Sequence, residues 1–110
     1  MSEPVIDEAT FRELQDAAGA DFVAELVDTF LEEAPGMLAA LRAARTSGDG
    51  DSFRRAAHSL KSNSLTFGAA ALAAAARALE LGGIGGEPAI DALQRDFDAA
   101  ALRLKELRDA

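Results

Sequence analysis

The stretch DFVAELVDTFLEEAPGMLAALRAA, residues 21–44, decides the fold class. Its apolar side chains recur every three or four residues, and this spacing places them on one face of an α-helix. We expect Asp21 to cap this helix at its N-terminus. Pro35 and Gly36 predict a kink near its middle, with a break as the alternative. The expected buried stripe consists of Phe22, Leu26, Phe30, Ala34, Met37, Leu41 and Ala44.

The rest of the chain repeats this helical period, and Gly-rich segments interrupt it. Asp7 predicts the cap of a short helix that stops near Gly19, and Pro88 suits the first turn of the last helix. No segment alternates like a strand. The sequence therefore predicts an all-α, antiparallel up-down four-helix bundle with a short N-terminal leading helix. The leading helix is expected over 7–18, and the bundle helices over 21–46, 51–66, 69–81 and 87–108.

Composition narrows the possible functions. A chain of 110 residues that is 49% hydrophobic predicts a single domain over 1–110. A net charge of −8 repels nucleic acid and anionic membranes, so neither is an expected partner. The absence of cysteine excludes disulfides and thiolate nucleophiles. The start, MSEPVIDEAT, lacks signal-peptide features, and no segment approaches the ~20 apolar residues of a membrane span, so we expect a cytoplasmic protein.

His58 is the only histidine in the chain, and it lies within RRAAHSLKSNS, residues 54–64. On a helical wheel it points away from the expected core face of its helix. That core face consists of Phe53, Ala56, Leu60 and Ser64. His58 is therefore expected on the exposed surface of the bundle.

The neighbours of His58 form a local cationic patch on an otherwise acidic chain. Small hydroxyl residues keep the surface low, and an exposed leucine offers an apolar anchor for a partner protein. The alternative is that the cations are ordinary solvated side chains. The expected docking surface consists of Arg54, Arg55, Ser59, Ser62 and Leu65, with Lys61 beside the imidazole.

A lone imidazole next to cations favours one kind of chemistry. With no second histidine and no cysteine, a metal site is not expected. A serine-hydrolase triad is also excluded, because His58, Ser59 and Ser62 share one helix without a strained nucleophile turn. Near neutral pH, however, a free imidazole can attack a phosphoryl group, and nearby cations can stabilise its oxygens. The residues therefore favour covalent phosphoryl transfer.

The motif His58-Ser59-Leu60-Lys61-Ser62, followed by Gly68-Ala69, resembles the histidine phosphotransfer (HPt) domains of phosphorelays. The family motif reads His-x-Leu-Lys-Gly with a later Gly-Ala, so Ser62 replaces a common glycine. The resemblance spans nearly the whole chain and implies an up-down four-helix bundle with a short leading helix.

The resemblance also implies roles. His58 is the expected phosphorylated nucleophile, Lys61 the stabiliser of the phosphoryl oxygens, Leu60 a core residue and Gly68 the site where two helices approach. The expected partners are the receiver domain of a response regulator and a histidine kinase or hybrid kinase. Mg²⁺ and the exchanging aspartate belong to the receiver, so the chain needs no cofactor of its own. It is expected to be a phosphocarrier rather than an enzyme with a small-molecule substrate.

Glu80 is a further candidate, on geometric grounds. Gly68 lies ten residues after His58 and twelve before Glu80, so antiparallel helices joined near Gly68 bring Glu80 level with the histidine. We expect Glu80 to accept a hydrogen bond from the ring and thereby fix its tautomer. The alternative is a solvated glutamate in the last turn of its helix.

Two other functions stay open at this point. One is the phosphoacceptor helix pair of a histidine kinase, where an acidic residue typically follows the reactive histidine; here Ser59 follows it. The other is a pseudo-HPt scaffold that binds partners without chemistry, and the presence of both His58 and Lys61 argues against it. Because four helices use up the apolar stripes, we expect a monomer.

Overall fold

The computed structural model describes residues 5–110, so residues 1–4 of the predicted domain lie outside the described part. Within it, the chain forms five helices and no strand. No helix there is long and apolar enough to cross a membrane. The helices are α1 (Glu8–Ala18), α2 (Ala20–Ser47), α3 (Gly50–Thr66), α4 (Ala70–Gly82) and α5 (Glu87–Asp109).

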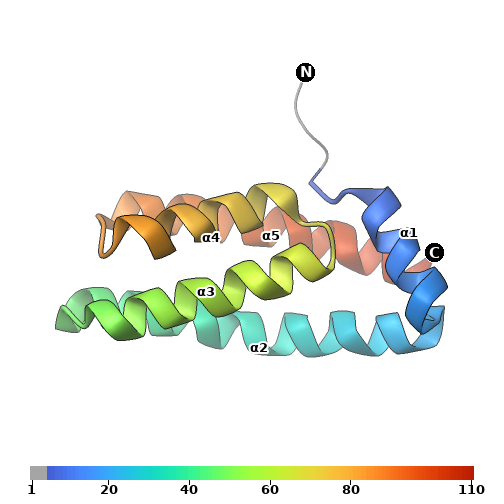
Figure 1. Ribbon diagram of the computed structural model, residues 1–110, viewed down its shortest axis with the longest axis horizontal. Coiled ribbons are helices and arrows are strands. Elements are labelled where there is room, and N and C mark those ends of the chain that lie inside the picture. The colour runs from blue at the N-terminus through green and yellow to red at the C-terminus, as the bar shows by residue number, and fades with distance from the viewer. Residues whose placement is uncertain (1–4) are drawn as a thin grey trace, which may run out of the picture.

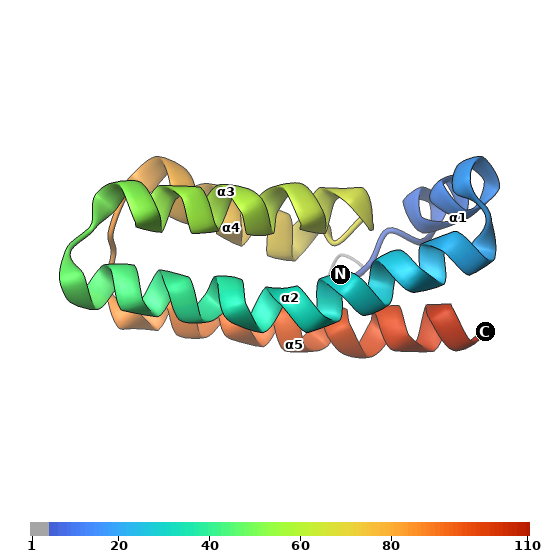
Figure 2. The same ribbon diagram turned by 90° about the horizontal axis from the view of Figure 1, so that it is seen from below.

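Helices α2 to α5 form an antiparallel bundle, and α1 lies across one end of it (Figure 1). α3 packs against both α2 and α4, while α5 packs against α2 and α4 from the other side (Figure 2). The turn between α3 and α4 lies at the same end as α1. The predicted all-α bundle with a short leading helix is confirmed.

Side-chain caps define the starts of two helices. Asp7 accepts a hydrogen bond from the Ala9 backbone N–H at 3.1 Å, as predicted, and starts α1. Asp49 does the same for Ser52 at the start of α3. The cap predicted for α2 was wrong, because Gly19, with φ +96°, both ends α1 and precedes the first residue of α2. Asp21 instead lies in the first turn, where its carboxylate favours the positive end of the helix dipole.

The buried face of α2 differs from the predicted stripe. Phe30, Ala34, Leu41 and Ala44 are buried as expected, but Phe22 is 51% exposed. Leu26 and Met37 only border the core. Their places are taken by the next residues along the chain, Val23, Val27 and Leu38. α2 also continues through Pro35 as one helix, so the alternative of a break is wrong.

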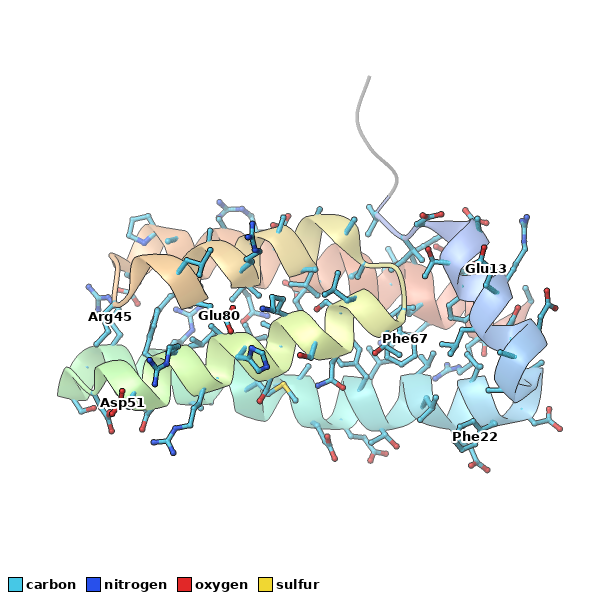
Figure 3. All side chains as sticks on the ribbon, in the orientation of Figure 1. Glu13, Phe22, Arg45, Asp51, Phe67 and Glu80 are labelled. Atoms are coloured by element: carbon cyan, nitrogen blue, oxygen red, sulfur yellow. The ribbon has the colours of Figure 1, made fainter. Side chains whose placement is uncertain are left out.

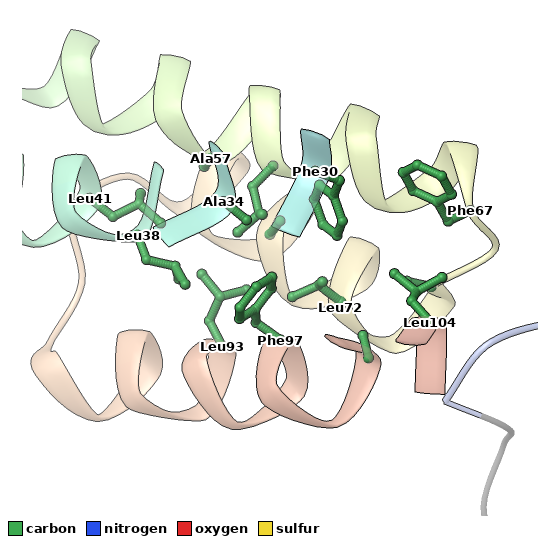
Figure 4. Close-up of a cluster of buried hydrophobic side chains, with 14 of the residues drawn as sticks. Phe30, Ala34, Leu38, Leu41, Ala57, Phe67, Leu72, Leu93, Phe97 and Leu104 are labelled. Carbon is green, nitrogen blue, oxygen red and sulfur yellow. The ribbon is translucent and has the colours of Figure 1, made fainter. Parts of the chain in front are cut away.

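The core is continuous along the bundle and is centred on aromatic rings (Figure 4). Phe30 of α2 lies between Phe67, at the end of α3, and Phe97 of α5, with ring centroids 5.4 and 5.9 Å apart. Such tilted and edge-on arrangements suit the charge distribution of aromatic rings. These contacts fix α3 relative to α2 and α5, and so fix the exposed face of α3.

Candidate functional site

The face that α3 presents to solvent follows from what it buries. Phe53, Leu60 and Ser64 are buried as predicted, but Ala57 is fully buried where Ala56 was expected, and Ala56 only borders the core. The reason is that α4 packs along the side of α3 that carries Lys61, which a single-helix wheel does not indicate. The buried Ser64 hydroxyl donates to the Leu60 carbonyl at 2.6 Å, so this polar group is satisfied.

His58 lies on the exposed face of α3, as predicted, and its side chain is 59% exposed. Its Nδ1 forms a hydrogen bond with Oε2 of Glu80 on α4. Within residues 5–110, Nε2 has no hydrogen-bond partner. The imidazole is therefore held through one nitrogen and open to solvent through the other.

Glu80 projects into the seam between α3 and α4 (Figure 3), and its side chain is only 13% exposed. Its second oxygen, Oε1, accepts a hydrogen bond from the Lys61 ammonium at 2.7 Å. The bond to Lys61 holds the pKa of the Glu80 carboxyl below its ordinary value; partial burial opposes this shift, and the hydrogen bond from His58 adds to it. Glu80 is therefore a carboxylate near neutral pH, and the alternative of a freely solvated glutamate does not describe it.

Each cation of the predicted patch beside His58 has a partner on α3 or α4. Lys61 turns toward Glu80. Arg54 pairs with Asp51 at 3.3 Å, and the Arg55 Nε donates to the Asp51 carbonyl at 3.4 Å. The expectation came from shared positions on one helix face. In the structure, the carboxylates of Asp51 and Glu80 pair with Arg54 and Lys61, and Arg55 donates to a backbone carbonyl.

The remaining predicted site residues, Ser59, Ser62, Leu65 and Gly68, form no hydrogen bond with the His58 ring. Ser59, Ser62 and Leu65 are exposed on α3, and Leu65 is 57% exposed. Gly68 lies in the turn between α3 and α4 with φ +76°. A Cβ there would come within 2.8 Å of the Asp7 carbonyl oxygen, so its close approach is to the segment that begins α1.

Sequence reasoning placed Glu80 of α4 beside His58 but missed the groove that α4 forms with α3. A groove of about 200 Å³ lies between α3 and α4, beside the ion pair of Lys61. Arg77 stands one turn before Glu80 on the same face of α4, and this spacing is the signal that could have indicated it. The groove is lined by Lys61, Leu65, Ala70, Ala73, Ala74 and Arg77.

In the described residues, no three His, Cys, Asp or Glu side chains are grouped as a metal site would need. The chemistry available at His58 is therefore that of an oriented, solvent-facing imidazole beside a carboxylate and an ammonium group.

The model of the Hpt domain family matches residues 25–110. This chain belongs to the Hpt family. Its structure is similar to the crystal structure of histidine-containing phosphotransfer protein B (HptB) from Pseudomonas aeruginosa PAO1. The two structures superpose with a TM-score of 0.88, and their sequences are 31% identical. The match covers 98% of this chain and 97% of the HptB chain. A search of curated proteins found no match.

Membership of the Hpt family and the similarity to HptB support a histidine phosphotransfer function in phosphorelays. Hpt proteins are carriers rather than classical enzymes, and the family implies interaction with kinases and response regulators.

Proposed function

We propose that this chain is a phosphorelay intermediate that accepts a phosphoryl group on Nε2 of His58 and exchanges it with the aspartate of receiver domains. The observation that carries the proposal is the hydrogen bond between Nδ1 of His58 and Glu80, on a face where Nε2 meets solvent. A proton on Nδ1, held by the carboxylate, leaves the lone pair on Nε2. That lone pair is the nucleophile.

The exchange is a displacement at phosphorus. The Nε2 lone pair forms the P–N bond while the bond between phosphorus and the receiver's aspartate oxygen breaks, and the electron pair of that bond leaves with the carboxylate. The proton on Nδ1 stays where it is, so the ring becomes a cation next to the Glu80 carboxylate. In the reverse step the P–N bond breaks and the imidazole leaves neutral.

Lys61 has two tasks in this proposal. Its ammonium lies 2.7 Å from Glu80 and one helical turn from His58. The lysine side chain is flexible, so the ammonium can also reach oxygens of a phosphoryl group carried by His58. Lys61 thus offsets charge on both the carboxylate and the transferred group.

We further propose that the chain needs no cofactor, because the receiver supplies Mg²⁺ and the aspartate. It would act as a carrier with no small-molecule substrate of its own. A cytoplasmic location and a monomeric state stay predictions. The oriented Nε2 of His58 supports this proposal over a pseudo-HPt scaffold without chemistry. The match to the Hpt family model supports it over a phosphoacceptor fragment of a histidine kinase.

The test is phosphotransfer from a panel of purified receiver domains, each labelled on aspartate. We expect one acid-labile, base-stable phosphoryl group on the wild-type chain and none on His58→Gln. The variant should keep the helical content and Tm of the wild type, because His58 is exposed and outside the core. A His58→Gln variant that still accepts the label would refute the assignment, and a wild type that binds receivers without accepting it would favour the scaffold.

A further inference from the structure

The groove between α3 and α4 begins at Lys61, one turn from His58, and extends toward the turn that joins the two helices. Its walls are mostly apolar, because alanine side chains of α4 face Leu65 of α3. Arg77 stands at its edge. The groove is thus an apolar depression bordered by two cations, Lys61 and Arg77, on a chain with a net charge of −8.

Arg77 differs from most cations among residues 5–110, because those cations have a hydrogen-bond or ion-pair partner there. Arg42, Arg103 and Arg108 each pair with acidic side chains. Arg77 has no hydrogen bond or ion pair to any of residues 5–110, and the same holds for Arg95 and Lys105 on α5. Of these three, Arg77 alone borders this groove. Its guanidinium is thus free to pair with a carboxylate from outside.

We propose that this groove receives a helix of the receiver domain, which inserts an apolar side chain between α3 and α4 and pairs a carboxylate with Arg77. The proposal rests on the proposed function of His58 and adds α4 to a docking surface that the sequence had limited to α3. A groove between two packed helices suits the ridge of a third helix. The specificity of the exchange would then depend on an apolar and an acidic residue side by side on the partner.

Distance favours the receiver as the occupant. Leu65 follows His58 by seven residues, which corresponds to a rise of about 10 Å along α3. A partner that brings its aspartate to Nε2 covers roughly 800 Å² of this surface in a standard interface, so the groove falls inside its footprint. A polyanion is a poor fit, because the groove offers only two cations and Glu80 already engages Lys61.

The first test reverses the charge at the groove. Arg77→Glu is compared with Lys105→Glu, which changes the same charge on an exposed, unpaired residue of α5. Each variant receives phosphate from the labelled receiver panel and, separately, from phosphoramidate. We expect the ratio of the receiver rate to the phosphoramidate rate to fall about tenfold for Arg77→Glu and to stay near that of the wild type for Lys105→Glu.

The second test fills the groove without a charge change. Ala74→Gln places a larger side chain in it, and Ala78→Gln makes the same change on an exposed part of α4 outside it. Glutamine is a good helix former, so both variants should fold. We expect only Ala74→Gln to slow exchange with the receiver relative to phosphoramidate.

The outcomes separate the two proposals. If Arg77→Glu and Ala74→Gln exchange with the receiver as fast as their controls, the groove is not the docking site, while labelling of wild-type His58 still supports the proposed function. If neither donor labels the wild type, the proposed function fails and the docking proposal fails with it.

Discussion

Glu80 of α4 contacts both His58 and Lys61 of α3. One carboxylate oxygen meets Nδ1 of His58, and the other accepts from Lys61. Both oxygens are thus occupied by side chains in a mostly buried position. Replacement by a neutral amide would leave only one acceptor for two donors.

We expect Glu80→Gln to accept phosphate at His58 from a receiver about three to ten times more slowly than the wild type. The reason is that the ring becomes a cation as the P–N bond forms, and a carboxylate stabilises that cation more than an amide does. The measurement is the rate at which the domain gains label from a labelled receiver. Glu25→Gln, at an exposed position of α2, is the control, and equal rates for the two variants would show that the carboxylate charge is unimportant.

Part of this site could be predicted residue by residue. The exposure of His58 follows from its helix wheel, and the position of Glu80 follows from equal rise on either side of a turn. The direction of Lys61 and the presence of Arg77 could not be predicted in the same way. A wheel indicates which side chains share a face of one helix, but it does not indicate which helix lies alongside.

At the scale of elements, the turn between α3 and α4 sets the register of the site. Gly68 adopts a positive φ of +76°, and its carbonyl accepts a hydrogen bond from the Asp7 N–H at 2.8 Å. The turn is therefore tied to the start of α1. Because His58 and Glu80 lie about equally far from this turn, a change in its geometry would shift one past the other.

Gly68→Ala is expected to destabilise the domain by about 1–3 kcal/mol, because the added Cβ meets a positive φ and the Asp7 carbonyl oxygen at 2.8 Å. Chemical denaturation gives the free energy of unfolding. Gly36→Ala is the control: Gly36 lies inside α2 with open space around it, so alanine there should stabilise by roughly 0.5–1 kcal/mol. A Gly68→Ala variant as stable as the wild type would contradict the tight approach.

The positions of the helices could be predicted, whereas the buried face of α2 could not. Gly breaks and caps such as Asp7 fix where a helix starts and stops. In α2, however, apolar residues come in adjacent pairs, such as Phe22 with Val23 and Met37 with Leu38. Either residue of such a pair continues a spacing of three or four residues. Which of the two is buried depends on how α3 and α5 pack on α2.

At the scale of the whole molecule, α1 connects parts that are distant in the sequence. Phe11 is buried in the core, and Glu8 accepts a hydrogen bond from Arg103 of α5 at 2.8 Å. That bond holds the pKa of the Glu8 carboxyl below its ordinary value of 4.5, against the opposing effect of burial. The end of the bundle is therefore held in part by a charge that acid removes.

The pH dependence of this link has a definite sign. Because the pKa of Glu8 is lower in the folded state, its stabilising effect is complete above the ordinary value and is lost as the pH falls through the lowered one. We expect Glu8→Gln to lower Tm at pH 7, and the difference from the wild type to shrink as the pH falls from roughly 5 to 3. Glu13→Gln, an exposed change on α1, should leave Tm unaltered at every pH. A constant difference for Glu8→Gln would rule out the charge as its cause.

The link between α1 and α5 also bears on the order in which the chain acquires its structure. The contact of His58 with Glu80 closes a loop of 22 residues, whereas that of Glu8 with Arg103 spans 95. Local contacts cost less chain entropy and form early, and distant ones wait for the elements between them. The hairpin that carries the imidazole can thus assemble before the ends of the chain meet.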